Sequence, residues 1–427
     1  MNQLTLLKSI VSTISTLLTS QEFLDAHRFP KRFVRKRFLS MYQVVMYLLY
    51  STKQAIHQNI SRIIDLDALD FPDVSKQAVS RARQGIKPSL FQELFDITVD
   101  MFSQSSVPKK LWRGRERVFA IDGSKIQLPN SSSNFEKFGE MFSKQNPEKR
   151  WSMALASVIY DVTNDYICHG LIRPFLSSER VAATDHCEAL ATLGILKGSV
   201  LVFDRGYYSE AMFRYFAENG YYCVMRLKEG LRLSKSCKGD TISSLEFSDD
   251  GEAAPAIIRV RVLAIDLGNG TTEYLATNLF SKEYTSKDFK ELYFMRWSLE
   301  LKYGEIKNQL FLEEFNGATS ISIEQEFYIN LLYSNLASLI KAPADAEIEE
   351  TAKPENKYRY QANRAYIIGR MKNIFVPVLC NAKPDSEFDT LLKRASRFRS
   401  QIQPGRSTER KRVKRDRAHF NNRKTAV

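Results

Sequence analysis

Two aspartates occupy positions from which they could hold divalent metal ions. Asp122 follows the apolar run 118–121, and Asp204 follows the apolar run 200–203. Ligand sites in α/β sheets gather at the carboxyl ends of strands, so the sequence predicts that both aspartates end strands and lie close together. The alternative is that each aspartate only caps the turn after its strand. The repetition of the pattern weighs against this alternative without deciding it.

A third acid, Glu300, belongs to a segment with helical periodicity. On one helix that turns about 100° per residue, four polar side chains fall within about 60° of one another, beside an apolar stripe. They are Tyr293, Arg296, Glu300 and Lys307. A carboxylate between two cations and an aromatic ring is typical of a surface that meets phosphate. A solvated helix face is the alternative.

Three convergent carboxylates favour phosphoryl transfer by metal ions. Mg²⁺ and Mn²⁺ prefer oxygen ligands. Two such ions about 4 Å apart can activate an attacking oxygen and stabilise a leaving oxygen. Other chemistries have less support, because the five histidines form no recognisable pair, the five cysteines form no CxxC pair, and the glycine-rich phosphate loop of nucleotide hydrolases is missing.

The segments around the two aspartates alternate between strand and helix patterns. Strands are expected near 117–122, 152–161, 165–172, 199–204 and 221–227. Helices are expected near 180–193 and 209–219. This alternation predicts an α/β sheet core.

The second half of the core is expected to be interrupted. Scattered glycines and two β-like runs predict a β-rich insertion at about 228–283. Helical periodicity returns at 286–310 and at 323–340, followed by a polar connection at 342–357.

The N-terminal part reads as helical, because apolar residues recur at three- and four-residue spacing from Asn2 to about Gln104. Within it, a short helix after Ser75 carries three basic residues, Lys76, Arg81 and Arg83. This segment predicts either a helix-turn-helix that contacts DNA or a solvated basic helix, with equal support.

Charge points to a polyanionic partner. The chain of 427 residues carries a net charge of +13, from 62 basic and 49 acidic residues. The segment Lys393–Val427 alone holds 13 basic and two acidic residues, and after Gln403 it has no apolar period. Nucleic acid is the expected partner. No stretch approaches the roughly 20 apolar residues of a membrane helix, so a cytoplasmic, nucleoid-associated protein is expected.

Taken together, Ile-Asp122-Gly-Ser, Phe-Asp204-Arg-Gly-Tyr and the Tyr-Arg-Glu-Lys spacing resemble a DDE transposase. The resemblance is to bacterial insertion-sequence transposases of the subgroup with the Tyr-Arg-Glu-Lys signature, the insertion-sequence family numbered four. It covers about 117–340. It implies an α/β fold, a ribonuclease H-like mixed sheet with a β-rich insertion, preceded by a helical DNA-binding domain.

The resemblance, together with the patterns above, gives four expected regions. They are a helical N-terminal DNA-binding domain at 1–105, a catalytic domain at 116–345, a C-terminal helical region at 346–402 and a basic tail at 403–427.

The resemblance also implies roles for the acids. Asp122, Asp204 and Glu300 would form the catalytic, metal-binding triad for two Mg²⁺ or Mn²⁺ ions. Water would cleave the DNA at the element ends, and the freed 3′-hydroxyl would then attack target DNA. Many relatives pass through a hairpin intermediate.

Further side chains would contact DNA. The resemblance assigns Tyr293, Arg296 and Lys307 to the terminal phosphates and to a flipped base. Arg205 would meet the DNA backbone or, equally, pair with a neighbouring carboxylate. Some relatives stack the flipped base on a tryptophan near the insertion, but no tryptophan lies between Trp151 and Trp297. The base-stacking residue therefore stays unassigned, with Tyr274 or another aromatic as a substitute.

The expected partners are the terminal inverted repeats of the element and its target DNA, bound by a homodimer, without a membrane. Two alternatives remain at this point. One is a metal-dependent nuclease of the same fold, which would cleave DNA without joining it. The other is a DNA-binding regulator derived from a transposase, in which the carboxylates are idle.

Overall fold

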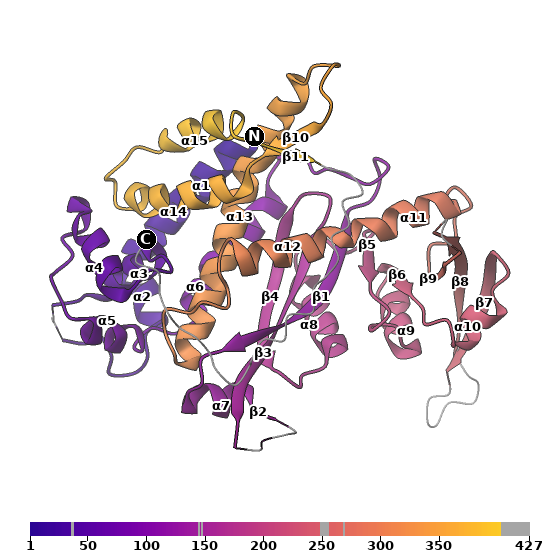
Figure 1. The fold of residues 1–427 in the computed structure, drawn as a ribbon, viewed down its shortest axis with the longest axis horizontal. Helices are drawn as coiled ribbons and strands as arrows, with labels where there is room; N and C mark the ends of the chain where they lie inside the picture. Colours follow the sequence, from indigo (N-terminus) through magenta and orange to yellow (C-terminus); the bar gives the residue numbers. More distant parts are fainter. Residues whose placement is uncertain (36–37, 144–145, 147, 248–255, 268–269, 403–427) are drawn as a thin grey trace.

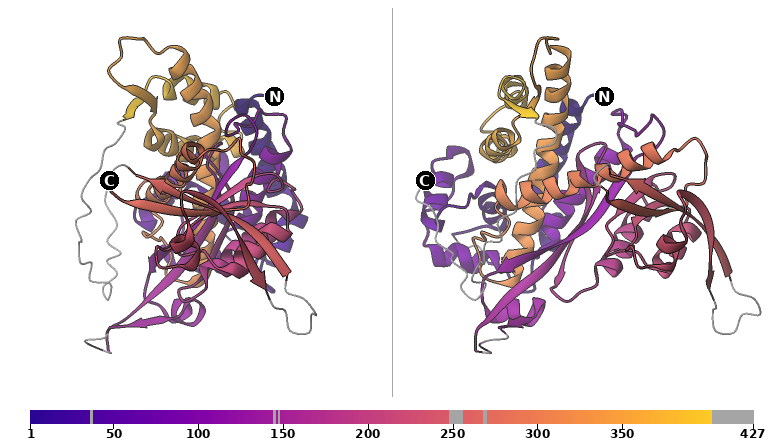
Figure 2. Two further views of the ribbon diagram at one scale, coloured as in Figure 1. Left: turned by 90° about the vertical axis from the view of Figure 1, so that its right-hand side faces the viewer. Right: turned by 45° about the vertical axis from the view of Figure 1, so that its right-hand side comes forward.

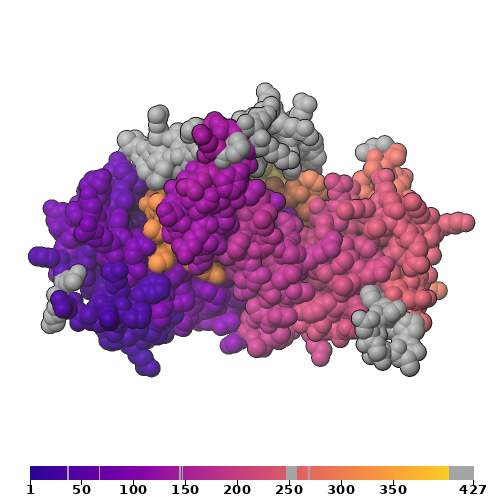
Figure 3. All heavy atoms as spheres, turned by 90° about the horizontal axis from the view of Figure 1, so that it is seen from below, coloured from indigo at the N-terminus to yellow at the C-terminus, as the bar shows by residue number. Residues whose placement is uncertain are grey.

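A mixed sheet occupies the middle of the computed structural model, with helices from both ends of the chain at one side and the insertion at the other (Figure 1). Figure 3 shows the N-terminal residues, in indigo, and the insertion, in pink, at opposite ends of the molecule. The structure describes residues 1–35, 38–143, 146, 148–247, 256–267 and 270–402. The basic tail after Ile402 lies outside the described residues. No described helix is long and apolar enough to cross a membrane.

Five strands form the core of the sheet in the order β4-β3-β1-β5-β6. They are β1 (Val118–Leu128), β3 (Arg150–Asp161), β4 (Tyr166–Pro174), β5 (Val200–Phe203) and β6 (Tyr222–Arg226). Strand β3 pairs antiparallel with both β1 and β4, whereas β5 and β6 run parallel to β1. This is the strand order of a ribonuclease H-like sheet, so the predicted fold class is confirmed.

The apolar runs explain why the parallel strands lie in the centre. All four residues of β5 are buried, as expected for a strand with neighbours on both sides and helices over its faces. Parallel strands need crossover connections, and helices provide them. These helices are α8 (Glu179–Ala191) and α9 (Glu210–Glu218). A short helix α7 (Ser132–Phe138) and strand β2 (Glu140–Phe142) flank β3.

The insertion is β-rich as predicted, and its strands extend the central sheet. Strand β6 pairs with β9, β9 with β8, and β8 with β7, which gives nine strands among the described residues. Figure 2 shows the strands of the insertion at the end of the molecule away from the N-terminal helices. The elements are α10 (Arg232–Ser236), β7 (Asp240–Phe247), β8 (Ala256–Asp266) and β9 (Thr272–Thr277). Buried Arg261 donates to the carbonyls of Leu279, Ser281 and Tyr284, which fixes the chain where it leaves the insertion.

The helix expected at 286–310 is interrupted. Helix α11 (Ser286–Met295) ends before Arg296, and α12 (Trp297–Asn308) begins after it. At the junction, the Arg296 N–H donates to the Tyr293 carbonyl, and the Leu299 N–H donates to the Arg296 carbonyl. These bonds span three residues, so the backbone tightens locally. The prediction of one continuous helix face is therefore wrong at this position.

The remaining helices come from the two ends of the chain. The N-terminal ones are α1 (Gln3–Thr19), α2 (Gln21–Ala26), α3 (Met41–Tyr50), α4 (Ile56–Ile64), α5 (Lys76–Arg83) and α6 (Ser89–Gln104), with the short helix η1 (Asp67–Leu69). The C-terminal elements are α13 (Ser320–Glu350), β10 (Arg359–Ala362), α14 (Arg364–Leu379), α15 (Glu387–Ala395) and β11 (Arg399–Ile402).

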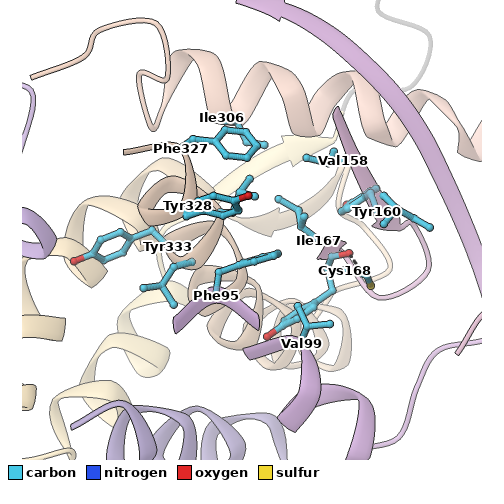
Figure 4. Packing of buried hydrophobic residues seen from close by; sticks show 14 of the residues in the cluster. Phe95, Val99, Val158, Tyr160, Ile167, Cys168, Ile306, Phe327, Tyr328 and Tyr333 are labelled. Carbon is cyan, nitrogen blue, oxygen red and sulfur yellow. Dashed lines mark hydrogen bonds between the residues drawn. The ribbon is translucent and has the colours of Figure 1, made fainter. Parts of the chain in front are cut away.

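Helix α13 is the axis around which these elements pack. It is buried at nearly every position between Ser322 and Ile340, and it contacts α1, α6, α14 and β4. Figure 4 shows Phe327 and Tyr328 of this helix among residues of α6 and β4. The helix continues to Glu350, so the polar connection expected from residue 342 begins later. One hydrophobic core thus joins both chain ends to the sheet, and the domain bounds stay a prediction.

A buried ion cluster joins the N-terminal helices to α13. The carboxylate of Glu326 accepts bonds from Lys53 Nζ at 3.0 Å, Arg83 Nη1 at 3.3 Å and the N–H groups of Asn316 and Gly317. Arg83 is only 5% exposed. Arg83 therefore stabilises the fold. Of the three cations that suggested a DNA-binding helix at α5, only Lys76 and Arg81 remain as candidate DNA contacts.

We expect Glu326→Gln to lower the free energy of unfolding by about 3 kcal/mol, because Lys53 and Arg83 would remain buried without their counter-charge. Glu349→Gln is the matched control, since Glu349 also pairs from α13, with Arg359, but both side chains are more than 70% exposed. It should cost less than about 0.5 kcal/mol. Urea denaturation of both variants measures this, and equal losses would contradict the assignment.

The same cluster predicts a loss of stability in acid. Burial alone raises the pKa of Glu326, but the charges of Lys53 and Arg83 and the Asn316 N–H outweigh it and lower the pKa to about 2. The contribution of the ionised Glu326 to the free energy of unfolding is therefore fully present above about pH 4.5, the ordinary pKa of a glutamate. It is lost as the pH falls toward 2.

Candidate active site

Asp122 and Asp204 meet at the end of the parallel part of the sheet. Strand β5 pairs with β1 only at residues 118–120, and Asp204 directly follows β5. Asp122 lies two residues beyond this pairing. It does not end its strand, because β1 continues to Leu128 in the antiparallel pairing with β3. The convergence of the aspartates agrees with the sequence, whereas the prediction that Asp122 ends a strand is wrong.

Backbone groups hold the two aspartates in place. The Asp122 carboxylate accepts the N–H of Gly123 at 2.8 Å, and the Asp204 carboxylate accepts the N–H of Arg205 at 2.7 Å. The Asp122 carbonyl accepts the hydroxyl of Tyr303 at 2.7 Å, which ties α12 to β1. Each carboxylate thus retains acceptor positions for a further ligand.

The pKa of the Asp122 carboxyl is shifted by burial and by charged neighbours. Burial is the largest cause that raises its pKa to about 6, and the negative charges of Glu179 and Asp204 add to the rise. The Gly123 N–H and the charge of Arg296 act in the opposite direction. Three carboxylates therefore share one partly buried place, where their mutual repulsion disfavours full ionisation.

Glu300 is linked to the two aspartates by Arg296, with which it forms an ion pair. It lies in the first turn of α12 and accepts a bond from Arg296 Nη2 at 3.2 Å. Burial lowers the pKa of Arg296, but Tyr293, Asp204 and Glu300 outweigh it, and the net shift is upward. The positive charge of Arg296 thus interacts electrostatically with all three predicted acids, Asp122, Asp204 and Glu300. Within the described residues, no group of three or more acidic, histidine or cysteine side chains is arranged so that it could hold a metal ion.

The expected DNA contacts differ in exposure. Tyr293 and Arg296 are 5% and 6% exposed, and the Tyr293 hydroxyl has no hydrogen-bond partner among the described residues. Lys307 donates to the Lys125 carbonyl at 3.1 Å, and Arg205 is exposed. Trp297 is about half exposed beside Arg296, whose guanidinium lies 5.7 Å from its ring centroid.

Two residues near the aspartates were missed from the sequence. Glu179 follows the capping Ser178 of α8, and a Ser-Glu pair at a helix start is an ordinary capping pattern. Tyr303 also donates to the Ala156 carbonyl, so it joins α12 to both β1 and β3. Its position three residues after Glu300 was a usable signal, because it places Tyr303 one turn further along the same helix.

The sheet order and the two aspartates beside β5 define a ribonuclease H-like protein with an acidic site. The sequence matches the family model described as a transposase DDE domain over residues 113–336. The chain belongs to this transposase DDE domain family, which confirms the family resemblance predicted from the sequence.

Two relatives illustrate the similarity. The transposase InsG for insertion sequence element IS4 of Escherichia coli (strain K12) is 22% identical over 289 residues, which are 65% of this chain. The chain spans 64% of the length of that relative. A piggyBac transposase, solved by cryo-EM as a synaptic complex with hairpin DNA, aligns with a TM-score of 0.45 and 11% identity, over 96% of this chain and 88% of that one.

We expect Asp122→Asn to stabilise the metal-free protein by about 2 kcal/mol at pH 7.5, because it removes a buried charge that Glu179 and Asp204 repel. The folded pKa of about 6 lies above the ordinary 3.8, so the penalty of ionisation is absent below about pH 4 and complete above about pH 6. The gain should therefore shrink in acid.

Thermal unfolding in EDTA across this pH range measures the effect. Asp73→Asn, at an exposed aspartate before α5, is the control and should leave stability unchanged. A gain that is independent of pH would argue against a crowded carboxylate at Asp122.

Proposed function

We propose that this chain is a DNA transposase, which cleaves the ends of an insertion sequence and joins the freed 3′-hydroxyl to target DNA. The observation that carries the proposal is the meeting of Asp122 and Asp204 beside the guanidinium that also binds Glu300. Membership of the transposase DDE domain family supports it. So does the similarity to a transposase for an insertion sequence element.

The donor set fits Mg²⁺ or Mn²⁺. All three acids offer hard oxygen ligands, and a divalent cation would offset the repulsion between Asp122 and Asp204. We propose that these two residues and Glu300 hold two ions, which supply charge stabilisation for phosphoryl transfer when bound. Because the Arg296 side chain is 7% exposed and that of Glu300 is 29% exposed, Glu300 is the partner that moves.

The cationic and aromatic side chains would then hold the DNA end. When Glu300 turns away, the guanidinium of Arg296 is left for a terminal phosphate, a bidentate partner that suits its geometry. Lys307 and the exposed Arg205 are two further cations that we propose for contacts with DNA. Tyr293 and Trp297 flank Arg296, and Trp297 offers an exposed ring for an unstacked base. A hairpin step on the element end is compatible with such a site and belongs to the same proposal.

Partners follow from the same chemistry. We propose that the terminal inverted repeats and the target DNA bind at the acidic site, with two copies of the chain holding the two element ends. The segment from residue 403 contains nine basic residues, and its role in non-specific DNA binding is predicted from charge alone.

The deciding experiment is cleavage and joining of a labelled duplex taken from the DNA that flanks this gene, with Mg²⁺. Wild type should nick and join, whereas Asp122→Asn, Asp204→Asn and Glu300→Gln should bind the duplex without cutting it. Cutting without joining would favour the nuclease. Binding without any cutting, with Mn²⁺ also tried, would favour the DNA-binding regulator.

We expect Arg296→Ala to reduce cleavage by about 10²-fold or more, because it removes a buried charge aimed at the reacting phosphate. Affinity for the duplex should change by less than about threefold, since one phosphate contact among many is lost. Lys287→Ala, an exposed lysine on α11, is the matched control and should affect neither property. An affinity loss as large as the cleavage loss would show that Arg296 acts in binding alone.

A further inference from the structure

Glu179 lies at the start of a helix that contacts the backbone near both aspartates. It opens α8, where the Ser178 hydroxyl caps the helix. The guanidinium of Arg180 donates to the carbonyls of Gly206 and Tyr208, both at 3.1 Å. The first turn of α8 is therefore fastened to the loop that follows Asp204.

The other side of Glu179 faces Gly123. A Cβ atom at residue 123 would lie 2.8 Å from Leu155 Cδ1, which is too short for a real side chain, and 3.0 Å from Glu179 Cγ, which is a tight contact. The backbone of Gly123 has no positive φ that would require glycine. Glycine at this position therefore leaves room for Leu155 and for the Glu179 side chain, which packs against the backbone of the residue next to Asp122.

Tyr207 supplies a second observation at the same place. Its side chain is 1% exposed, and its hydroxyl has no hydrogen-bond partner among the described residues. Burial raises the pKa of this hydroxyl far above its ordinary value, and the charges of Asp122, Glu179 and Asp204 contribute to the rise. A buried phenol that lies among carboxylates without a partner indicates a polar ligand at this point.

We propose that Glu179 is a fourth carboxylate ligand of the divalent-metal centre, with the Tyr207 hydroxyl donating a hydrogen bond inside the same ligand shell. The inference rests on the proposed function, which supplies the metal, and it adds a ligand that the predicted triad lacks. It also explains why Asp122 and Asp204 have a close acidic neighbour while Glu300 pairs with Arg296.

A structural role for Glu179 is the competing explanation. Lys125 is the cation whose charge acts on Glu179, and an ion pair between them would fasten α8 to β1 without any metal. Lys125 Nζ instead lies 4.3 Å from the centroid of the Phe175 ring, and no ion pair joins it to Glu179 within the part of the chain that the structure describes. The ion pair that this explanation requires is therefore not formed.

The test is Mn²⁺ binding to the full-length chain, measured by the electron paramagnetic resonance signal of unbound Mn²⁺. We expect Glu179→Gln to weaken binding by about tenfold or more, the size of effect expected at a metal site. Glu188→Gln, at an exposed glutamate further along α8, is the matched control and should bind as wild type does. Thermal unfolding in EDTA should show that both variants are folded.

The variant Asp122→Asn distinguishes failure of the Glu179 inference from failure of the proposed metal centre. If Asp122→Asn loses Mn²⁺ and Glu179→Gln binds as tightly as wild type, the inference is overturned while the metal centre stands. If wild type itself binds no Mn²⁺, both the inference and the proposed metal chemistry fall. Should Glu179→Gln fail to fold, Glu179→Asp keeps the charge but shortens its reach, and unchanged affinity in that variant would also overturn the inference.

Discussion

Repulsion between carboxylates confined at the junction of β1 and β5 is the constraint on which the rest of the structure depends. Glu179 and Asp204 both make ionisation of Asp122 more costly, and Asp204 does the same to Glu179. A fold gathers such groups only when something of opposite charge compensates them. Arg296 provides part of this compensation from the break between α11 and α12. The incomplete compensation is what makes the site suited to a divalent cation.

The scaffold resists this repulsion by fixing α12 on two sides. Toward the sheet, the Tyr303 hydroxyl bonds to carbonyls of both β1 and β3. Away from the sheet, a buried ion network joins α12 to the β3–β4 turn and to α14. Its members are Lys302, Glu305, Asp165 and Arg364. Because the helix is held at both faces, Glu300 and Arg296 keep their places relative to β1 while their side chains remain able to exchange partners.

Apolar runs and helical spacing were enough to predict the α/β core, the convergence of Asp122 and Asp204 and the helical character around Glu300. Each of these features depends on local periodicity. The sequence could not show that the insertion strands extend the central sheet, because periodicity predicts a strand but not its neighbour. It also could not show that Arg83 is buried, since its partner Glu326 lies 243 residues away. Glu179 was missed because an acid at a helix start has an ordinary structural explanation.

Arg296 and Glu300 differ in exposure, and under the proposed function this difference decides which of the two side chains would move when DNA binds. Withdrawing the buried guanidinium would leave Asp122 and Asp204 without compensation, whereas Glu300 lies nearer to solvent and can turn at lower cost. The ion pair between Arg296 and Glu300 would then be replaced by two stronger contacts. Arg296 would bind a DNA phosphate, and Glu300 would bind a metal ion. Under the proposed function, the carboxylates beside β1 and β5 are in place before DNA binds, and arrival of the DNA end would change only the partner of Glu300.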